Sequence, residues 1–222
     1  MDSRQKYILI RTLSNFLIIG SITYLLLSFG PIVKTELSYY FLKWRGITYT
    51  IEKGEDTKKY SPFSYLIGSP TPLRVDPVNK GFSIIIEKLG VNAPIVKNVD
   101  MVNQKEYLEA LKYGVAQAKG SNYPGSSNGV TYLFAHSALD FWNFGKYAMV
   151  FTLLNKVEIG DRLVLYYEGN RFDYKVTTRE VFRDFDLTPI KRNYNEPTLV
   201  LQTCDPPGTA LNRLIVTATL IR

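Results

Sequence analysis

The pattern of apolar and polar residues divides the chain into three parts. Residues 12–33 form a long apolar stretch without a charged side chain. A segment rich in charges and prolines follows as far as residue 80. From residue 82 onward, short β-branched and aromatic runs alternate with turn residues. This order predicts a membrane-spanning helix, then a linker, then one mostly β domain over residues 81–222.

The apolar stretch is long enough to cross a membrane. At about 1.5 Å per residue, residues 12–33 span roughly 33 Å, against about 30 Å for the hydrocarbon core. Pro31 lies at the end of the apolar run and no small-x-small site follows, so we favour an uncleaved signal anchor over a cleaved signal peptide. Residues 1–11 are then a short N-terminal tail. Basic residues flank both sides of the stretch in equal number, so charge alone does not orient it.

Residues 34–80 read as a juxtamembrane segment and linker. The aromatic residues 36–44 are expected to extend the helix or to lie in the membrane interface. Beyond them come a charged run at residues 52–59 and several prolines, which interrupt regular structure. For residues 37–68, a short accessory helix packed on the domain and a disordered segment remain equally open.

The remaining part of the chain predicts a β-barrel. Residues 106–113 and 147–154 carry apolar side chains at helical spacing and predict two short helices. Lys88-Leu89-Gly90 suits a hairpin turn between the first two strands. The eight expected strands are residues 82–86, 91–96, 114–117, 130–135, 162–167, 172–181, 197–203 and 214–221. Eight such strands favour a closed or nearly closed barrel.

Charge argues against a nucleic-acid function. The net charge is +7, but residues 1–80 carry 11 Lys and Arg against 6 Asp and Glu, whereas residues 81–222 carry 16 against 14. The domain itself is therefore close to neutral. Basic segments near a membrane suit anionic lipid headgroups or wall polymers, and we expect no nucleic-acid partner.

The counts of cysteine and histidine exclude several kinds of site. One cysteine cannot form an internal disulfide, and one cysteine with one histidine cannot make the usual zinc sites. We expect no cofactor and no bound metal. Calcium activation stays open, although Glu158, Glu168 and Glu180 are candidates only because they are acidic.

His136, Cys204 and Arg213 form a possible reactive group. Alone, a histidine at a strand end is structural as often as not, and an arginine at a strand start is more often solvated than catalytic. Here His136 follows one predicted strand, Cys204 follows another, and Arg213 begins the return strand nine positions later. Such an order can place an acid or base, a nucleophile and an anion-stabilising cation at one mouth of a barrel.

The sequence around these residues resembles the sortases. Residues 200–204, Val-Leu-Gln-Thr-Cys, resemble the family's Thr-Leu-x-Thr-Cys motif with valine in the first position. Residues 212–216 resemble its last strand, which begins with arginine. The segment before His136 is a partial match, with Pro124-Gly125 and Asn128-Gly129. Ala135-His136-Ser137 departs from the family's Gly-His-Arg, so the role of that arginine is absent or filled elsewhere.

This resemblance, over residues 82–222, implies a membrane-anchored cysteine transpeptidase of a bacterial cell surface. It implies that Cys204 attacks a peptide carbonyl, that His136 transfers protons and that Arg213 stabilises the oxyanion. The expected partners are secreted proteins with a C-terminal sorting signal and an amine acceptor, such as a peptidoglycan precursor or a pilin lysine. The domain would lie outside the cytoplasm on a single membrane span.

The resemblance also suggests where a sorting peptide binds. In sortases the strand floor and the loop between the sixth and seventh strands contact the substrate. The corresponding residues here are Leu201 and Thr203 on the strand, and Leu187, Pro189 and Ile190 in the loop.

Two other functions remain open. One is a hydrolytic cysteine peptidase of the same fold, and the other is a non-catalytic, membrane-tethered β-domain that binds a wall component. Papain-like folds place cysteine before histidine, unlike this chain. L,D-transpeptidases place the two within a short segment, also unlike this chain.

Overall fold

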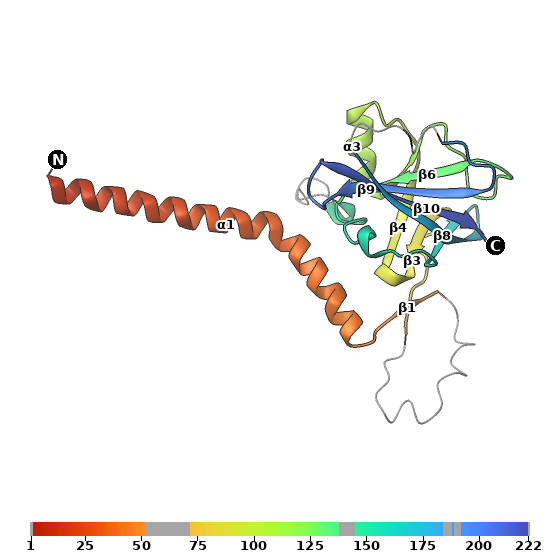
Figure 1. Cartoon of the computed structure of the whole chain (residues 1–222), viewed down its shortest axis with the longest axis horizontal. Helices are drawn as coiled ribbons and strands as arrows, with labels where there is room; N and C mark the ends of the chain where they lie inside the picture. Colours follow the sequence, from red (N-terminus) through yellow and green to blue (C-terminus); the bar gives the residue numbers. More distant parts are fainter. Residues whose placement is uncertain (1, 52–71, 138–144, 184–187, 189–191, 222) are drawn as a thin grey trace, which may run out of the picture.

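The computed structural model describes residues 2–51, 72–137, 145–183, 188 and 192–221. A long helix, α1 (Ser3–Trp44), extends from the N-terminus to a β-barrel that contains the C-terminus (Figure 1). Two short strands, β1 (Tyr49–Thr50) and β2 (Leu73–Arg74), pair in parallel beside the barrel.

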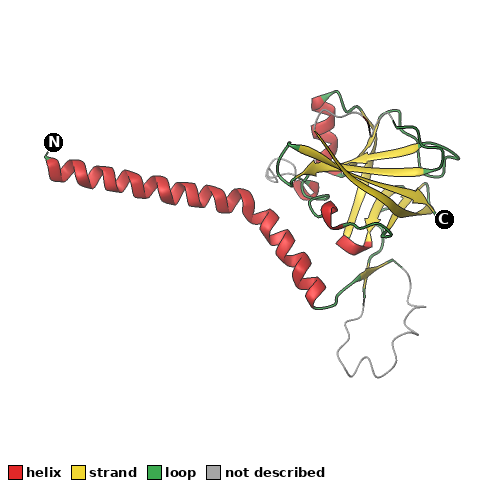
Figure 2. Ribbon diagram, viewed as in Figure 1, coloured by secondary structure: helices red, strands yellow, loops and turns green. Residues whose placement is uncertain are grey.

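The barrel has the eight strands that the sequence predicts. Figure 2 shows these strands in yellow. They form a closed barrel in the order β10-β8-β7-β3-β4-β5-β6-β9. Their bounds are β3 (Phe82–Ile86), β4 (Val91–Val99), β5 (Val115–Ala118), β6 (Val130–Phe134), β7 (Arg162–Tyr167), β8 (Asn170–Arg183), β9 (Thr198–Asp205) and β10 (Asn212–Leu220). The β4–β5 and β6–β9 pairs are parallel, and the other pairs are antiparallel. The predicted mostly β fold is confirmed.

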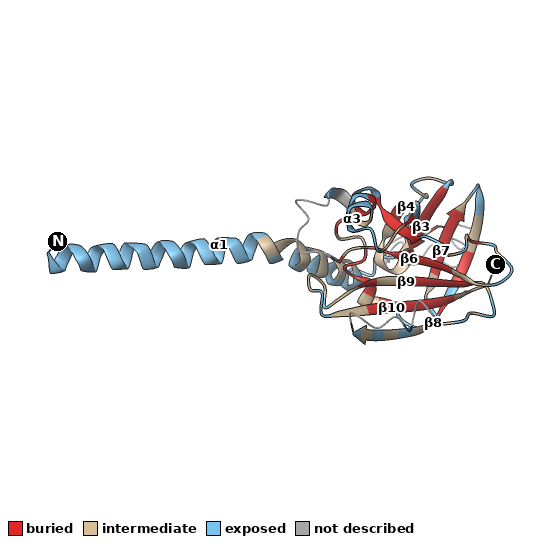
Figure 3. Cartoon of the chain, turned by 90° about the horizontal axis from the view of Figure 1, so that it is seen from above, coloured by how far each residue is buried: buried red, intermediate tan, exposed pale blue. Residues whose placement is uncertain are grey.

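Helix α1 is longer than the predicted span at both ends. It includes the aromatic residues 36–44, which confirms that they extend the helix, and it is long and apolar enough to cross a membrane. No residue of α1 is buried, and Figure 3 shows it exposed along most of its length. Pro31 lies inside the helix. Because proline has no N–H and crowds the carbonyl four residues earlier, it bends a helix, and Figure 1 shows α1 bent in its second half.

The two predicted short helices have different outcomes. The first is α3 (Gln104–Tyr113), whose first turn is capped by the side chain of Asn103, which accepts from Glu106 N. The second, at residues 147–154, consists of turns between the 3-10 helices η3 (Gly145–Tyr147) and η4 (Leu154–Lys156). Phe151 and Leu154 are still fully buried. Successive turns thus bury the same apolar spacing without an α-helix.

Part of the predicted linker packs on the barrel. Ile51 and Val75 flank the β1–β2 pair and contact a small buried cluster that includes Ile85, Val164 and Tyr166. These last residues belong to β3 and β7, on the side away from the main core. Residues 52–71, between β1 and β2 in the sequence, lie outside the described residues. Residues 34–80 are therefore not a plain linker, because Ile51 and Val75, on either side of these residues, contact the barrel.

The hairpin turn between β3 and β4 holds β1 in place. The 3-10 helix η2 (Glu87–Leu89) leads into Gly90, which has a φ of 65°. A Cβ at Gly90 would lie 2.7 Å from the ring of Tyr49. Glycine is required here both by the left-handed backbone and by the close approach of β1.

Candidate active site

Three neighbouring strands bring His136, Cys204 and Arg213 to one level of the barrel. Strands β6 and β9 are parallel, and their register pairs Phe134 with Gln202. Two residues further along each chain, the same register sets His136 level with Cys204 and on the same face. In the antiparallel β9–β10 pair, Arg213 lies directly opposite Cys204. The cysteine is therefore between the other two residues.

Cys204 and Arg213 are in contact. Nη1 of Arg213 lies 3.4 Å from Sγ of Cys204, and the same nitrogen donates to the carbonyl of Asn212 at 3.2 Å. Cys204 is half-buried. A guanidinium beside a sulfur stabilises its thiolate form and offers N–H donors to an oxyanion that develops at the attacked carbon.

The imidazole of His136, just after the end of β6, packs against the ring of Tyr107. The ring of Tyr107, from α3, meets the imidazole edge-on at 5.8 Å between centroids, and it stacks on Phe134 at 5.2 Å. The carbonyl of His136 accepts from Phe151 N at 3.3 Å. Burial lowers the pKa of His136 from 6.5 to about 4. The imidazole is therefore neutral at pH 7, the form in which a general base acts, and the same burial makes it a weaker base than an exposed histidine.

Ser137 joins the two strand ends that carry His136 and Cys204. Its buried hydroxyl donates to the carbonyl of Cys204 at 2.9 Å. Its own carbonyl accepts from Gly208 N in the turn between β9 and β10. One position earlier, Ala135 N donates to Gln202 O at 3.1 Å. These bonds continue the β6–β9 pairing past the last paired residues and fix the relative heights of histidine and cysteine.

The face that carries Cys204 is the outer face of the barrel. Phe134 and Gln202 share this face, and Phe134 is covered by Tyr107 of the external helix α3. The hydroxyl of Tyr132 is hydrogen-bonded to the side chain of Gln202. Burial raises the pKa of Tyr132, so the phenol stays protonated and donates to Oε1 of Gln202.

The connection from β8 to β9 is attached to the same face. Arg192 forms a salt bridge of 2.8 Å with Glu180 of β8, and Glu180 pairs with Ile215 of β10. Ile215 lies two residues after Arg213 and thus on its face. This end of the connection consequently borders the outer surface next to the catalytic candidates.

The predicted substrate-binding residues do not line this face as a group. Leu201 and Thr203 alternate with Cys204 along β9, so they point to the opposite face, where they are 0% and 4% exposed. The Thr203 hydroxyl donates to the carbonyl of Ala135 at 3.0 Å. Both therefore pack the interior beneath the site. The loop residues Leu187, Pro189 and Ile190 lie outside the described residues.

Sequence reasoning missed the residues that surround the trio. Tyr107 falls within the helix predicted over residues 106–113, without a role of its own. Gln202 occupies the free position of the motif, and Ser137 enters only as a departure from the family pattern. A signal for Ser137 was present, because a small hydroxyl residue directly after His136 can bond a neighbouring strand end. The contacts of Tyr107 depend on how α3 packs, which the sequence pattern does not give.

The described residues contain no group of three or more histidine, cysteine, aspartate or glutamate side chains that could hold a metal ion. Glu158 is bound by Lys88 at 2.7 Å, and Glu180 by Arg192. Glu168 lies in the turn between β7 and β8. The acidic residues considered for calcium are thus separate from one another.

Comparison with known proteins agrees with this fold. The family model described as the sortase domain matches residues 84–221. Sortase C1 of GBS pilus island 1 is similar at 25% identity, with a TM-score of 0.53, over 64% of this chain and 64% of that one. The chain thus spans less than two thirds of that relative. Comparison with curated proteins gave no match.

Other sortase structures share the fold. Sortase C-1 from Actinomyces oris has 23% identity and a TM-score of 0.54, over 87% of this chain and 99% of that one. Listeria monocytogenes sortase A has 23% identity and a TM-score of 0.51, over 64% and 86%. The likeness therefore extends across sortase classes C and A. Because the family model covers most of the chain and the whole barrel apart from Phe82 and Ser83, the chain belongs to the sortase family.

Proposed function

We propose that the protein is a cysteine transpeptidase that cleaves a sorting motif and transfers the new acyl end to an amine. The observation that carries this proposal is the contact of Arg213 with the sulfur of Cys204, at the same level as His136 on the next strand. The three groups supply the nucleophile, the proton carrier and the positive charge that acyl transfer requires.

The first half-reaction forms a thioester. The Cys204 sulfur attacks the carbonyl carbon of the scissile peptide bond, and the thiol proton passes to the neutral imidazole of His136. The negative charge on the carbonyl oxygen is stabilised by the N–H groups of Arg213. When the C–N bond breaks, His136 gives the proton to the leaving amine. The products are a Cys204 acyl thioester and a free amine.

The second half-reaction uses an acceptor amine. His136, neutral again, takes a proton from the amine as its nitrogen attacks the thioester. Collapse of the intermediate forms the new amide, and the sulfur leaves as a thiol after receiving the proton back. Transfer exceeds hydrolysis only where the amine is positioned better than water.

The family suggests the partners. We infer that the donor is a secreted protein with a C-terminal sorting signal, of the Leu-Pro-x-Thr-Gly type. The acceptor would be a cell-wall peptide amine or a pilin lysine. In this proposal α1 anchors the barrel as a single span with the site outside the cytoplasm, and no cofactor takes part.

The test is product analysis with the full-length chain in detergent. The protein is incubated with a library of sorting-motif peptides, with and without an added amine such as triglycine, and intact mass and products are measured. We expect an acyl adduct on the wild type, an amide product with the amine, and neither in Cys204→Ala.

The other two functions give different results. Free acid as the sole product, even with abundant amine, would favour the hydrolytic peptidase. No adduct with any peptide, together with unchanged wall binding by Cys204→Ala, would favour a binding domain. The double variant C204A/A210C is a matched control, because it moves the only thiol to an exposed position in the β9–β10 turn.

A further inference from the structure

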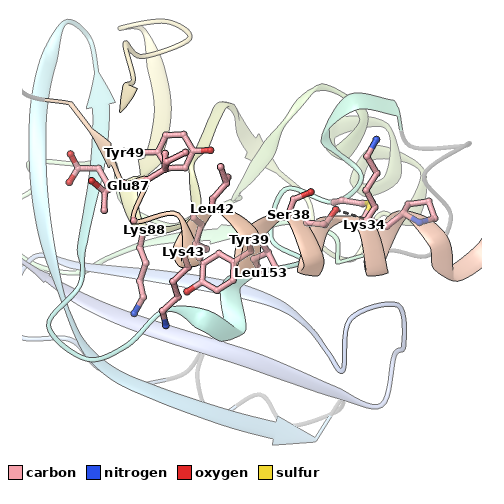
Figure 4. Close-up of a pocket in the computed structure, with 16 residues that line it drawn as sticks. Lys34, Ser38, Tyr39, Leu42, Lys43, Tyr49, Glu87, Lys88 and Leu153 are labelled. Carbon is pink, nitrogen blue, oxygen red and sulfur yellow. Dashed lines mark hydrogen bonds between the residues drawn. The ribbon is translucent and has the colours of Figure 1, made fainter. Parts of the chain in front are cut away.

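A cavity lies between the second half of α1 and the barrel, away from the active site. Its volume is about 750 Å³. One wall is a stripe of α1 that runs from Pro31 to Lys43, and the other is formed by Tyr49, the η2 turn and Leu153 (Figure 4). None of His136, Cys204 and Arg213 lines it.

The lining of the cavity is amphiphilic. Its apolar side chains come from α1, the segment after it, η2 and the turns before η4, and they are Leu42, Ile47, Leu89, Met149 and Leu153. Hydroxyl groups from Thr35, Ser38 and Tyr39 lie along the α1 wall. A volume of this size, lined by apolar side chains together with hydroxyl and charged groups, can hold an amphiphilic small molecule.

Two lysines give the rim its available positive charge. Lys34 and Lys43 line the cavity from opposite edges of the α1 stripe, and both are exposed. Among the described residues, neither lysine forms a salt bridge. The acidic group that Lys43 affects is Glu158, whose pKa is lowered first by Lys88 and also by Lys43.

The other charges around the cavity are paired. Lys88 contacts Glu158 at 2.7 Å and Asp161 at 3.0 Å. The carboxylate of Glu87 is bound by Arg162 at 2.8 Å and accepts from Ile51 N at 2.7 Å. Nearby, Lys156 contacts Glu36 at 3.0 Å. An anion at the rim would therefore meet Lys34 and Lys43 first.

The position of the cavity relative to the apolar part of α1 points to a lipid as its ligand. It begins at Pro31 and Lys34, directly where the uncharged run of residues 12–33 ends. If α1 crosses a membrane, this level coincides with the phosphate groups of the lipids. We propose that the cavity binds one anionic glycerophospholipid, with its phosphate at Lys34, an acyl chain against the apolar wall, and Lys43 adding positive charge at the far end of the cavity. The proposal depends on membrane anchoring through α1 and not on the chemistry at Cys204.

A bound lipid has a structural consequence. Direct contact of the α1 stripe with the barrel is limited to a few side chains, such as Lys156 with Glu36 and Tyr40. A lipid in the cavity fills the space between the two and couples the orientation of the barrel to the bilayer.

The experiment is native mass spectrometry of the full-length chain in detergent. The purified protein is titrated with phosphatidylglycerol, with phosphatidylcholine of the same acyl chains, and with soluble glycerol phosphate. The test variants are K34Q/K43Q, which removes the charges, and Ser38→Trp, which fills the cavity. The matched control is K6Q/R11Q, which removes two charges from the other end of α1.

We expect one phosphatidylglycerol per chain, bound about tenfold or more tightly than phosphatidylcholine. K34Q/K43Q should remove this preference, Ser38→Trp should remove the bound lipid, and K6Q/R11Q should behave as wild type. Equal effects of K34Q/K43Q and K6Q/R11Q would overturn the proposal in favour of general lipid attraction. Full competition by glycerol phosphate would overturn it in favour of a simple anion site.

Discussion

At the scale of single residues, the protonation state of His136 bears on the first step of the proposed mechanism, the transfer of the thiol proton of Cys204. The His136 pKa of about 4, lowered by burial, makes the imidazole neutral at pH 7. The proposed mechanism therefore does not start from an ion pair between a Cys204 thiolate and a protonated His136. In the proposed mechanism, the proton for the leaving amine comes from the thiol and passes through the histidine, while Arg213 supplies the positive charge next to the sulfur.

The same pKa makes stability depend on pH. The unfolded chain protonates His136 near pH 6.5 and the folded chain only near pH 4, so in this window the unfolded state binds more protons. Stability should fall as pH decreases from 6.5 to 4, by about 2 to 3 kcal/mol from this residue. The measurement is the melting temperature at pH 7 and pH 4.5 for wild type and His136→Gln. The variant should lose less on acidification, and an equal loss would contradict the buried, neutral imidazole.

Arg213 should be more than a structural residue. Arg213→Ala removes the donors beside Cys204 Sγ, and we expect kcat/KM for transpeptidation to fall about 10²- to 10³-fold. Arg213→Lys keeps the charge but loses the fork of N–H groups, so it should recover only part of the activity. Peptide turnover by the three proteins is the measurement. Activity of Arg213→Ala within threefold of wild type would remove the arginine from the mechanism.

At the scale of elements, the strands are predictable and the connections are not. Most barrel strands are short apolar runs between turn residues, whereas β8 mixes apolar and polar positions over 14 residues. Burial on one or both faces enforces these patterns. Residues 147–154 show the limit, because turns and an α-helix can bury the same side chains. The β1–β2 pair shows another, since its two strands are far apart in sequence and each has only two residues.

The candidate site shows the same difference between features that the sequence predicts and features that it does not. The motif around Cys204 and the place of Arg213 could be predicted, because both lie on strands with a fixed register. Leu201 and Thr203 lie three positions and one position before Cys204 on β9, so alternation along the strand already places them on the face opposite the thiol. The contact of Tyr107 with His136 depends on the packing of α3, a tertiary feature without a local signal.

The bond from Ser137 to Cys204 O connects two elements, the end of β6 and the end of β9. Ser137→Ala leaves a carbonyl without this donor, and we expect a loss of about 1 kcal/mol in stability together with slower acylation of Cys204. Ser121→Ala is a matched control, because its hydroxyl donates to the carbonyl of Ala118 at 2.8 Å outside the site.

Denaturant unfolding and acylation rates separate the two effects of Ser137→Ala. Both alanine variants should lose similar stability, but only Ser137→Ala should react more slowly under conditions where both are folded. Equal reaction rates would show that Ser137 stabilises the barrel without positioning the cysteine.

At the scale of the whole molecule, the boundary of the folded body differs from the boundary that composition suggests. A change in composition near residue 80 marks the first barrel strand. The packing of Ile51 and Val75 on Ile85, Val164 and Tyr166 shows that the body begins earlier. Ile51 N also donates to Glu87, and Glu87 in turn binds Arg162 of β7. The segment after α1 therefore covers an apolar patch on the outside of the barrel.

This arrangement predicts how soluble fragments behave. A fragment that begins at Gly81 exposes Ile85, Val164 and Tyr166, whereas one that begins at Gly46 keeps them covered by Ile51 and Val75. Each lost aliphatic contact costs about 1.5 to 3 kcal/mol at most, so the shorter fragment should melt roughly 5 to 10 °C lower. The shorter fragment should also associate more readily, because the uncovered patch is apolar.

Melting curves and sedimentation of the two fragments are the measurements, with the longer fragment carrying Ile51→Ser as the matched control. That variant should fall between the two fragments. Equal melting temperatures for all three would mean that the barrel is complete without the segment that links it to α1.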